Sequence, residues 1–207
     1  MKGILFTAEM ALAACADRKT RTRRVIVTQP LVSTTAINHF RGRIWHANMP
    51  DPEIKGLTLH LGEHSCDYVA GERRCLLTTW AVLPRLDKTL PTEIPLLDAQ
   101  RFFWHAGMGK KPSWVSKSRP GRFLPNHLRS LMPVFEVVRV RAERVNAISE
   151  ENAKAEGVTL VVGNPRRHDG LDYSSEFASL WDSINARRGF GWSGNPWVWV
   201  VEFRRIA

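Results

Sequence analysis

The sequence predicts an α+β fold, a small mixed β-barrel with short flanking helices in a single domain covering residues 1–207. Segments with strand-like alternation are separated by single helices, without the regular strand–helix–strand rhythm of a doubly wound sheet. The chain carries no internal repeat and no low-complexity tract, which argues against repeat architectures. With 43% hydrophobic and 24% charged residues, a chain of 207 residues can bury a core of its own.

The first quarter of the chain predicts a strand, a helix and a second strand. Ile4-Leu5-Phe6 is an apolar run short enough for a buried strand. Thr7 is a suitable N-cap for a helix over Ala8–Ala16, whose small alanines allow close approach to a sheet. A strand is expected over Arg21–Thr28. Residues 30–56 show no clean period and carry several glycines and prolines, so a loop-like insertion is expected there.

The middle of the chain alternates strands with a long irregular region. Leucines alternate with polar residues over 57–61, which predicts a half-buried strand. A second strand is expected over 73–82. Residues 84–125 are rich in proline, glycine, lysine and aromatic residues, and this composition predicts a second insertion, with a short helix near 97–105.

The C-terminal third has the most regular patterns. Residues 134–145 alternate as a strand does, and Ser149 is an N-cap for a short helix that ends before Gly157. A second helix begins at Ser174 or Ser175 and is stopped by Gly189. Residues 197–205 alternate aromatic and aliphatic residues as a closing strand.

The charge of the chain favours an anionic partner. Lys and Arg number 30 against 20 Asp and Glu, giving a formal net charge of +10. Nucleic acid is the commonest partner of such a surface, while a basic but simply solvated surface is the alternative.

We expect a protein of the cytoplasm, and a monomer, although the sequence itself does not determine the oligomeric state. Its three cysteines are odd in number and irregularly spaced, so no disulfide framework is predicted and a reducing compartment fits. No apolar run approaches the roughly 20 residues that span a bilayer, so no membrane association is expected. His60, His64 and Cys66 lack a second Cys or His pair, and no metal and no cofactor are predicted.

A basic run stands between the first helix and the second strand. Asp17-Arg18-Lys19-Thr20-Arg21-Thr22-Arg23-Arg24 holds four arginines, one lysine and two threonines. An extended chain would direct Arg18, Thr20, Thr22 and Arg24 to one face and Lys19, Arg21 and Arg23 to the other. The run is either an anion-binding wall or a solvated basic turn.

Two features of the sequence, one in the basic run and one in the short acidic helix, suggest acid–base chemistry. A threonine hydroxyl becomes a nucleophile only beside a base, and Lys19 could serve Thr22 if a turn brought them together. Glu156 ends the short acidic helix, where the dipole disfavours a carboxylate, and such a position is sometimes kept for function. The alternatives are a basic loop with capping threonines and a glutamate paired to a nearby cation.

A second basic segment carries interleaved aromatic residues. Cations beside aromatic rings suit single-stranded nucleic acid, because bases stack on rings while phosphates pair with cations. The alternative is tryptophans that pack and lysines that are solvated. The candidate nucleic-acid-binding residues of this segment are Lys110, Lys111, Trp114, Lys117, Arg119 and Arg122.

Taken together, these segments resemble the ASCH domain family of the PUA-like superfamily, and in particular its longer phage and prophage members. The resemblance rests on the opening strand and helix with the basic run, and on Thr79-Trp80-Ala81. It also rests on motifs in the second half, which are Val138–Val145, Ile148–Ala153, Ala155–Val158, Leu180–Asn185 and Asn195–Phe203. Cys66-Asp67-Tyr68 and Gly71-Glu72 add to it, whereas residues 30–56 and 84–125 carry little of the match.

The resemblance implies a PUA-like barrel with a cleft for a nucleobase or RNA, in the cytoplasm (the host cytoplasm for a phage-encoded chain). Small ASCH proteins include an amidohydrolase that deacetylates acetylcytidine, and its catalytic residues fall on Lys19, Thr22 and Glu156 here. The implied substrate- or anion-binding residues are Arg18, Arg21, Arg23, Arg24 and Trp80.

The function expected from the resemblance is deacylation of an N-acylated cytosine nucleoside, with nucleoside or RNA as the partner. The alternatives are a non-catalytic RNA- or nucleotide-binding module and an RNA-cleaving enzyme. In longer members Arg-Glu often precedes Thr-Trp-Ala, whereas Leu77 and Thr78 stand here. Loss of that glutamate removes one possible cleft partner of Arg23 or Arg24, so the family's substrate preference is not expected to carry over strictly.

Overall fold

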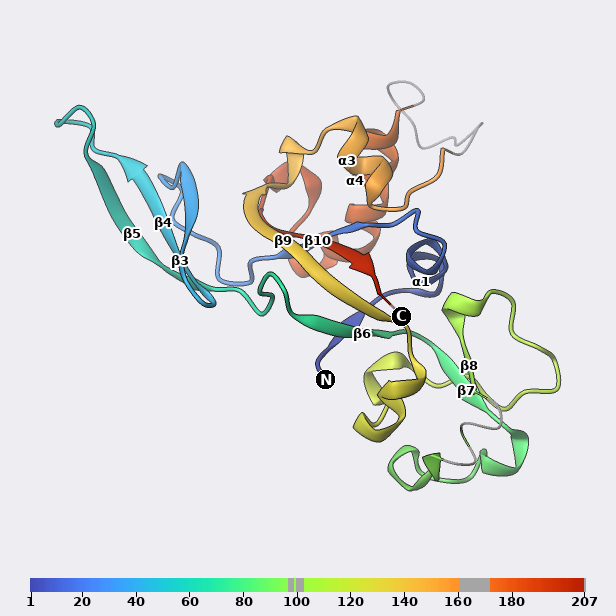
Figure 1. The fold of residues 1–207 in the computed structure, drawn as a ribbon. Helices are drawn as coiled ribbons and strands as arrows, with labels where there is room; N and C mark the ends of the chain where they lie inside the picture. Colours follow the sequence, from blue (N-terminus) through green and yellow to red (C-terminus); the bar gives the residue numbers. More distant parts are fainter. Residues whose placement is uncertain (97–98, 100–102, 161–171, 207) are drawn as a thin grey trace. The chain divides into compact units, whose positions relative to one another are not determined.

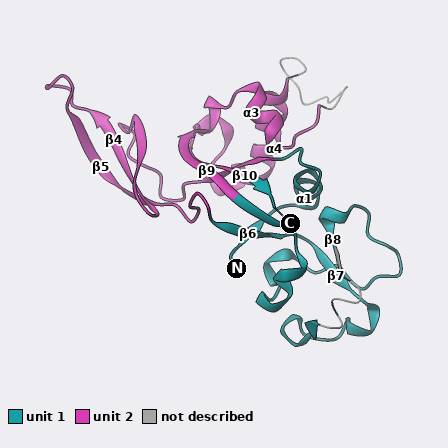
Figure 2. Cartoon of the chain, in the orientation of Figure 1, with its two compact units in different colours: residues 1–19, 72–136, 204–207 teal, residues 20–71, 137–203 magenta. Residues whose placement is uncertain are grey.

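The structure, a computed structural model, describes residues 1–96, 99, 103–160 and 172–206. They form an α+β protein, as the sequence predicts. The chain divides into two compact units (Figure 2). Unit 1 comprises Met1–Lys19, Glu72–Glu136 and Arg204–Ala207, and unit 2 comprises Thr20–Gly71 and Val137–Phe203.

Unit 1 contains a short parallel pair extended by an antiparallel strand. β1 (Gly3–Leu5) lies parallel to β6 (Arg73–Leu77), with Ile4 opposite Leu76. β6 pairs antiparallel with the first residues of β9 (Val134–Arg144), which continues into unit 2. Helix α1 (Ala8–Cys15) is capped by Thr7, whose hydroxyl accepts from the Met10 amide at 3.3 Å, so the predicted N-cap is confirmed.

The long irregular region of unit 1 contains short 3-10 helices among its described residues. They are η1 (Pro84–Leu86), η2 (Pro91–Glu93), η3 (Ala106–Met108), η4 (Gly121–Phe123) and η5 (Asn126–Leu131). β7 (Trp80–Val82) pairs antiparallel with β8 (Phe103–His105), so the end of the helix expected over 97–105 is a strand instead. Cross-strand pairing with β7 overrides the local pattern. Residues 97–98 and 100–102 of that expected helix lie outside the described residues.

Unit 2 contains β2 (Arg21–Val25), most of β9 and β10 (Trp197–Arg205), in the order β9-β10-β2. It also contains the antiparallel sheet β3-β4-β5, drawn from blue to teal in Figure 1. These strands are Ala36–Arg41, Ile44–Pro50 and Thr58–Ser65. The loop predicted over 30–56 is therefore wrong, because Ile37, Trp45 and Ala47 lie on one face of these strands and are buried in the core, while Asn38 and His46 lie on the other face.

Two apolar clusters cover opposite faces of the β9-β10-β2 sheet. One includes Trp45, Cys66, Trp199 and Val201, and receives residues of the three-stranded sheet. The other includes Val198 and Val200 and lies beneath the helices α3 (Glu150–Ala155) and α4 (Tyr173–Asn185). Among its described residues, unit 2 also contains the 3-10 turns η6 (Val145–Ala147), η7 (Ala186–Arg188) and η8 (Trp192–Gly194).

The predicted closure into a barrel is absent from the described residues, whose sheets are open. A barrel needs every strand to be paired on both sides, and β1 and β2 each have a single strand neighbour there. Within the same described ranges, no helix is both long enough and apolar enough to cross a membrane.

Candidate functional site

The basic run is divided between two faces where it forms β2. Thr22 lies opposite Val201 and Arg23 opposite Val200 on β10. Val200 belongs to the helix-covered cluster and Val201 to the cluster on the other face. Arg21 and Arg23 therefore face the helices, and Thr22 and Arg24 face away from them, as the alternation predicts.

Arg23 is held in a buried ionic cluster on the helix-covered face. Its side chain is 0% exposed, and Nη1 lies 3.0 Å from Glu156 Oε1. Nε donates to Glu143 Oε1 at 3.1 Å, and the guanidinium lies 5.6 Å from the centre of the Phe177 ring. Two carboxylates thus satisfy one desolvated guanidinium, which is the condition under which a buried charge is tolerated.

The cluster continues toward solvent through two more arginines. Arg141 donates to Glu143 Oε2 at 3.1 Å and also to Glu202. Arg21 donates to Asn152 of α3, and its Nε lies 3.7 Å from Glu202 Oε1. Cations and carboxylates alternate along this face, so its charges stabilise one another.

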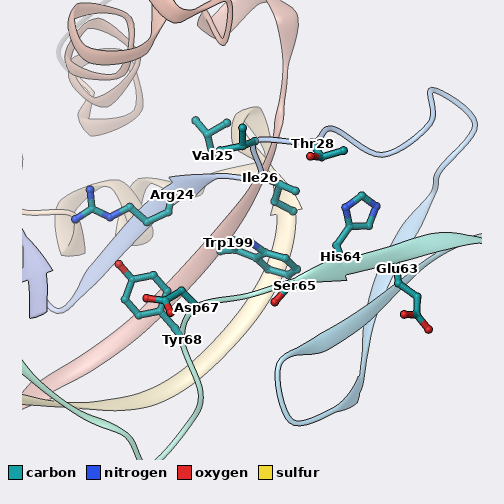
Figure 3. Close-up of a pocket in the computed structure, with 11 residues that line it drawn as sticks. Arg24, Val25, Ile26, Thr28, Glu63, His64, Ser65, Asp67, Tyr68 and Trp199 are labelled. Carbon is teal, nitrogen blue, oxygen red and sulfur yellow. The ribbon is translucent and has the colours of Figure 1, made fainter. Parts of the chain in front are cut away.

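A pocket of about 500 Å³ opens on the other face of β2 (Figure 3). Arg24 and Trp199 are directly opposed on β2 and β10, and both line it. The end of β5 and the residues that follow supply its other wall. The lining residues are Arg24, Val25, Ile26, Val27, Thr28, Glu63, His64, Ser65, Asp67, Tyr68 and Trp199.

The pocket combines aromatic surface with groups of both charges. Trp199 is buried, and its ring lies 5.1 Å from that of Trp45, which fixes its position. Burial lowers the pKa of His64, and a hydrogen bond to the Thr28 backbone opposes this in part. His64 is therefore a neutral donor and acceptor at neutral pH. With Arg24 and Asp67, the pocket offers a cation, an anion and a neutral polar ring.

The three residues expected to be catalytic occupy different environments. Thr22 is 5% exposed and lies on the pocket side of β2, whereas Glu156 is 3% exposed and contacts Arg23 on the helix-covered side. Glu156 is also the C-cap of α3. Lys19 is the last residue of unit 1, where its amide donates to the Ala13 carbonyl and its ammonium lies 5.4 Å from the centre of the Phe6 ring.

Two further expected binding residues also lie in unit 1. Arg18 is exposed, at the end of the turn that follows α1. Trp80 is 0% exposed, and its indole donates to the Pro120 carbonyl at 3.3 Å. A ring without accessible surface offers no face for stacking, so the structure gives Trp80 a packing role.

The basic aromatic segment of unit 1 is partly surface and partly scaffold. Lys110, Lys117, Arg122 and Trp114 are exposed, and Phe123 is 55% exposed beneath the Arg122 guanidinium. By contrast, Lys111 donates to the Ser116 carbonyl, and Arg119 donates to the Leu86 and Asp87 carbonyls and packs on Trp80. Only the exposed residues Lys110, Lys117, Arg122, Trp114 and Phe123 therefore present cations and aromatic rings to solvent.

Most pocket residues were missed by sequence reasoning. His64 was considered only as a metal ligand, Asp67 and Tyr68 only as part of a motif, and Trp199 as a residue of the closing strand. These residues come together because β2 pairs with β10 while the chain after β5 crosses the same face. The pairing of β2 with β10 cannot be predicted from any local sequence pattern.

No protein-family model matches the chain, and no curated protein matches it. Among solved structures, the chain is similar to the crystal structure of protein EF3133 from Enterococcus faecalis V583, of the family model DUF984. The two share 12% identity with a TM-score of 0.41, and the match covers 100% of this chain and 81% of the other.

Proposed function

We propose that the protein binds a nucleoside or nucleotide, free or within RNA, in the pocket of unit 2, as a PUA-like protein resembling the ASCH family. The observation that carries this is the pocket of about 500 Å³ in which Arg24 and Trp199 lie side by side on paired strands. Pockets for small ligands have volumes of roughly 300–1,000 Å³.

The lining matches the parts of a nucleotide. The partly exposed Tyr68 ring offers a stacking surface to a base, and the buried Trp199 ring lines the pocket beside Arg24. His64, Asp67, Ser65 and Thr28 offer donors and acceptors to base edges or ribose hydroxyls. The Arg24 guanidinium suits a phosphate oxygen because its fork of donors matches that geometry. The net charge of +10 raises the local concentration of such an anion.

Calorimetric titration with cytidine, the other common nucleosides, their monophosphates and a short single-stranded RNA tests this proposal. We expect at least one compound to bind, and Arg24→Gln to weaken a monophosphate by about 10- to 100-fold, since a charge-assisted hydrogen bond contributes about 1.5–3 kcal/mol. Arg187→Gln removes an exposed arginine of unit 2 outside the pocket and serves as the control. Absence of binding across the whole panel, or equal weakening by both variants, contradicts the proposal.

The amidohydrolase version of this function remains a proposal of its own. Thr22 lies on the same side of β2 as Arg24, which supports a nucleophile near the pocket, whereas Glu156 is engaged by Arg23 across the strand. This division favours binding over hydrolysis. Release of acetate from acetylcytidine by the full chain, abolished in Thr22→Val and Lys19→Ala, would favour the enzyme, whereas no turnover by the unmodified protein would exclude this substrate.

Binding to RNA has independent support in unit 1. Trp114, Phe123, Lys110, Lys117 and Arg122 are all exposed, and the Arg122 guanidinium lies 4.9 Å from the centre of the Phe123 ring. If these residues contact RNA, the logarithm of the affinity falls linearly with the logarithm of the salt concentration. Replacing the three cations by glutamine should flatten that slope by about two units, and an unchanged slope would remove the segment from the interface.

A further inference from the structure

Two histidines and a glutamate lie together on the three-stranded sheet of unit 2. His46 is on β4, and His60 and Glu63 are on β5. One potential ligand atom from each lies within 4.8 Å of the others. His60 and Glu63 are exposed and His46 is partly exposed, so a small ion can reach the cluster from solvent.

A β-bulge brings these three side chains to one face. Glu63 lies directly opposite His46, and Ala47 is opposite Gly62. The register then shifts, because Asn48 is opposite His60 and leaves Leu61 as the extra residue. Without the bulge, residues three apart on β5 would point to opposite faces. The bulge thus places His60 beside Glu63 while Leu61 packs against the core cluster.

The distances suit a single metal ion. His46 Nε2 lies 3.4 Å from Glu63 Oε1. Two ligands about 2.05 Å from a tetrahedral zinc ion are separated by about 3.3 Å, so one ion fits between these atoms. The His46 and His60 ring centres are 4.3 Å apart. The other side of His46 is stacked on Phe40, at 4.2 Å and 19°, which limits rotation of the imidazole.

The His46 ring nitrogen is unsatisfied in a way that a bound metal ion would correct. Among the described residues, His46 Nε2 is a buried atom without a hydrogen-bond partner, even though Glu63 Oε1 is close. A buried polar atom without a partner is unfavourable by about 1–3 kcal/mol. A cation shared with His60 and Glu63 would satisfy this nitrogen and neutralise the carboxylate at the same time.

We propose that His46, His60 and Glu63 bind one Zn²⁺ ion, with solvent completing its coordination. Two imidazoles and one carboxylate are a zinc ligand set that leaves a position for water. The expectation of no metal came from His60, His64 and Cys66, and the structure separates these three. His64 lines the pocket and Cys66 is 0% exposed in the core, while the second histidine comes from a strand that the sequence did not predict.

Titration of the metal-free protein, residues 1–207, with Zn²⁺ against a chelating indicator tests the site. We expect one ion per chain, and at least tenfold weaker binding for His46→Gln, His60→Gln and Glu63→Gln. His39→Gln is the matched control, because this exposed histidine belongs to the same sheet but lies opposite Trp45, on the other face. The control should bind as the unmodified protein does.

Cobalt substitution gives a second measurement that does not depend on affinity. Visible absorption of the Co²⁺ form should show a low-coordinate site with nitrogen and oxygen ligands in the unmodified protein and in His39→Gln, and lose intensity in His46→Gln. Circular dichroism establishes that each variant is folded. No zinc binding by the folded protein, or equal binding by the ligand variants and His39→Gln, overturns the proposal. It does not depend on nucleotide binding, which is measured separately with Arg24→Gln.

Discussion

The ion pair between Arg23 and Glu156 predicts that Glu156 stabilises unit 2. The Arg23 side chain is 0% exposed and that of Glu156 is 3% exposed, with 3.0 Å between Nη1 and Oε1. Removing one member of a buried pair costs about 3–5 kcal/mol, because the other charge is left desolvated. In Glu156→Gln, Arg23 keeps Glu143 and a neutral acceptor, so we expect the free energy of unfolding to fall by about 3 kcal/mol, at the lower end of that range. Arg23→Met removes the partner of two carboxylates and should cost about 4 kcal/mol.

Urea unfolding followed by circular dichroism and tryptophan fluorescence measures these free energies. Glu151→Gln is the control, since Glu151 is an exposed carboxylate of the same helix and its loss should cost less than about 0.5 kcal/mol. The double variant of Arg23 and Glu156 should cost at least about 1 kcal/mol less than the sum of the single changes. If Glu156→Gln matches Glu151→Gln, the ion pair is not stabilising, and the catalytic assignment of Glu156 becomes the better explanation of its burial.

Three further predictions concern stability. Burial, aided by Arg205, lowers the pKa of His105 from 6.5 to about 4. The unfolded chain therefore binds this proton at a higher pH than the folded chain does. The free energy of unfolding should fall by at most about 3 kcal/mol as the pH drops from about 6.5 to about 4. In urea titrations, His105→Gln should make the free energy of unfolding depend less on pH over this range. Gly121→Ala places a Cβ 2.5 Å from the Thr78 backbone nitrogen, so it should cost about 1–3 kcal/mol in urea unfolding, whereas Gly194→Ala, which has room for a Cβ, should not. Asn195 has a φ of 44°, and its side-chain oxygen accepts a hydrogen bond from the Asn146 amide at 3.1 Å. Asn195→Ala loses this hydrogen bond and strains the backbone, so thermal unfolding should show a free energy of unfolding lower by about 2 kcal/mol. Asn195→Gly loses only the hydrogen bond, so its free energy of unfolding should fall by about half as much.

The elements with strong local signals could be predicted from the sequence. Thr7 and Ser149 cap α1 and α3 as expected, since a hydroxyl before a run of helix formers satisfies an amide of the first turn. The alternation over β9 and β10 likewise gave their positions. β3 and β4 were missed because Asn38, His46 and Asn48 lie on their outward face, and Ile37, Trp45 and Ala47 are the buried apolar residues of the inward face. The apolar–polar alternation in these strands is short, and the nearby glycines and prolines predict turns more strongly than the alternation predicts strands.

The candidate site was less predictable than the fold, because it depends on pairings between distant strands. Arg24 could be singled out from its basic run, but its neighbour Trp199 depends on the register of β2 with β10. The cluster of His46, His60 and Glu63 depends on one extra residue in β5, and nothing in the spacing of His60 and Glu63 reports a bulge. A shift of one residue in either pairing would move these side chains to the opposite face.

The division of the basic run explains how adjacent arginines come to have different roles. Arg23 and Arg24 are neighbours in β2, yet the first is sealed beneath α3 and α4 with two carboxylates and the second lines a pocket. The buried arginine fixes the end of α3 against the strand, and the strand in turn fixes the position of its neighbour in the pocket. Under the proposed nucleotide binding, a mutation at Arg23 would weaken affinity through unfolding or displacement of β2, whereas a mutation at Arg24 would weaken it directly. Measuring affinity and unfolding free energy for both variants separates these two causes.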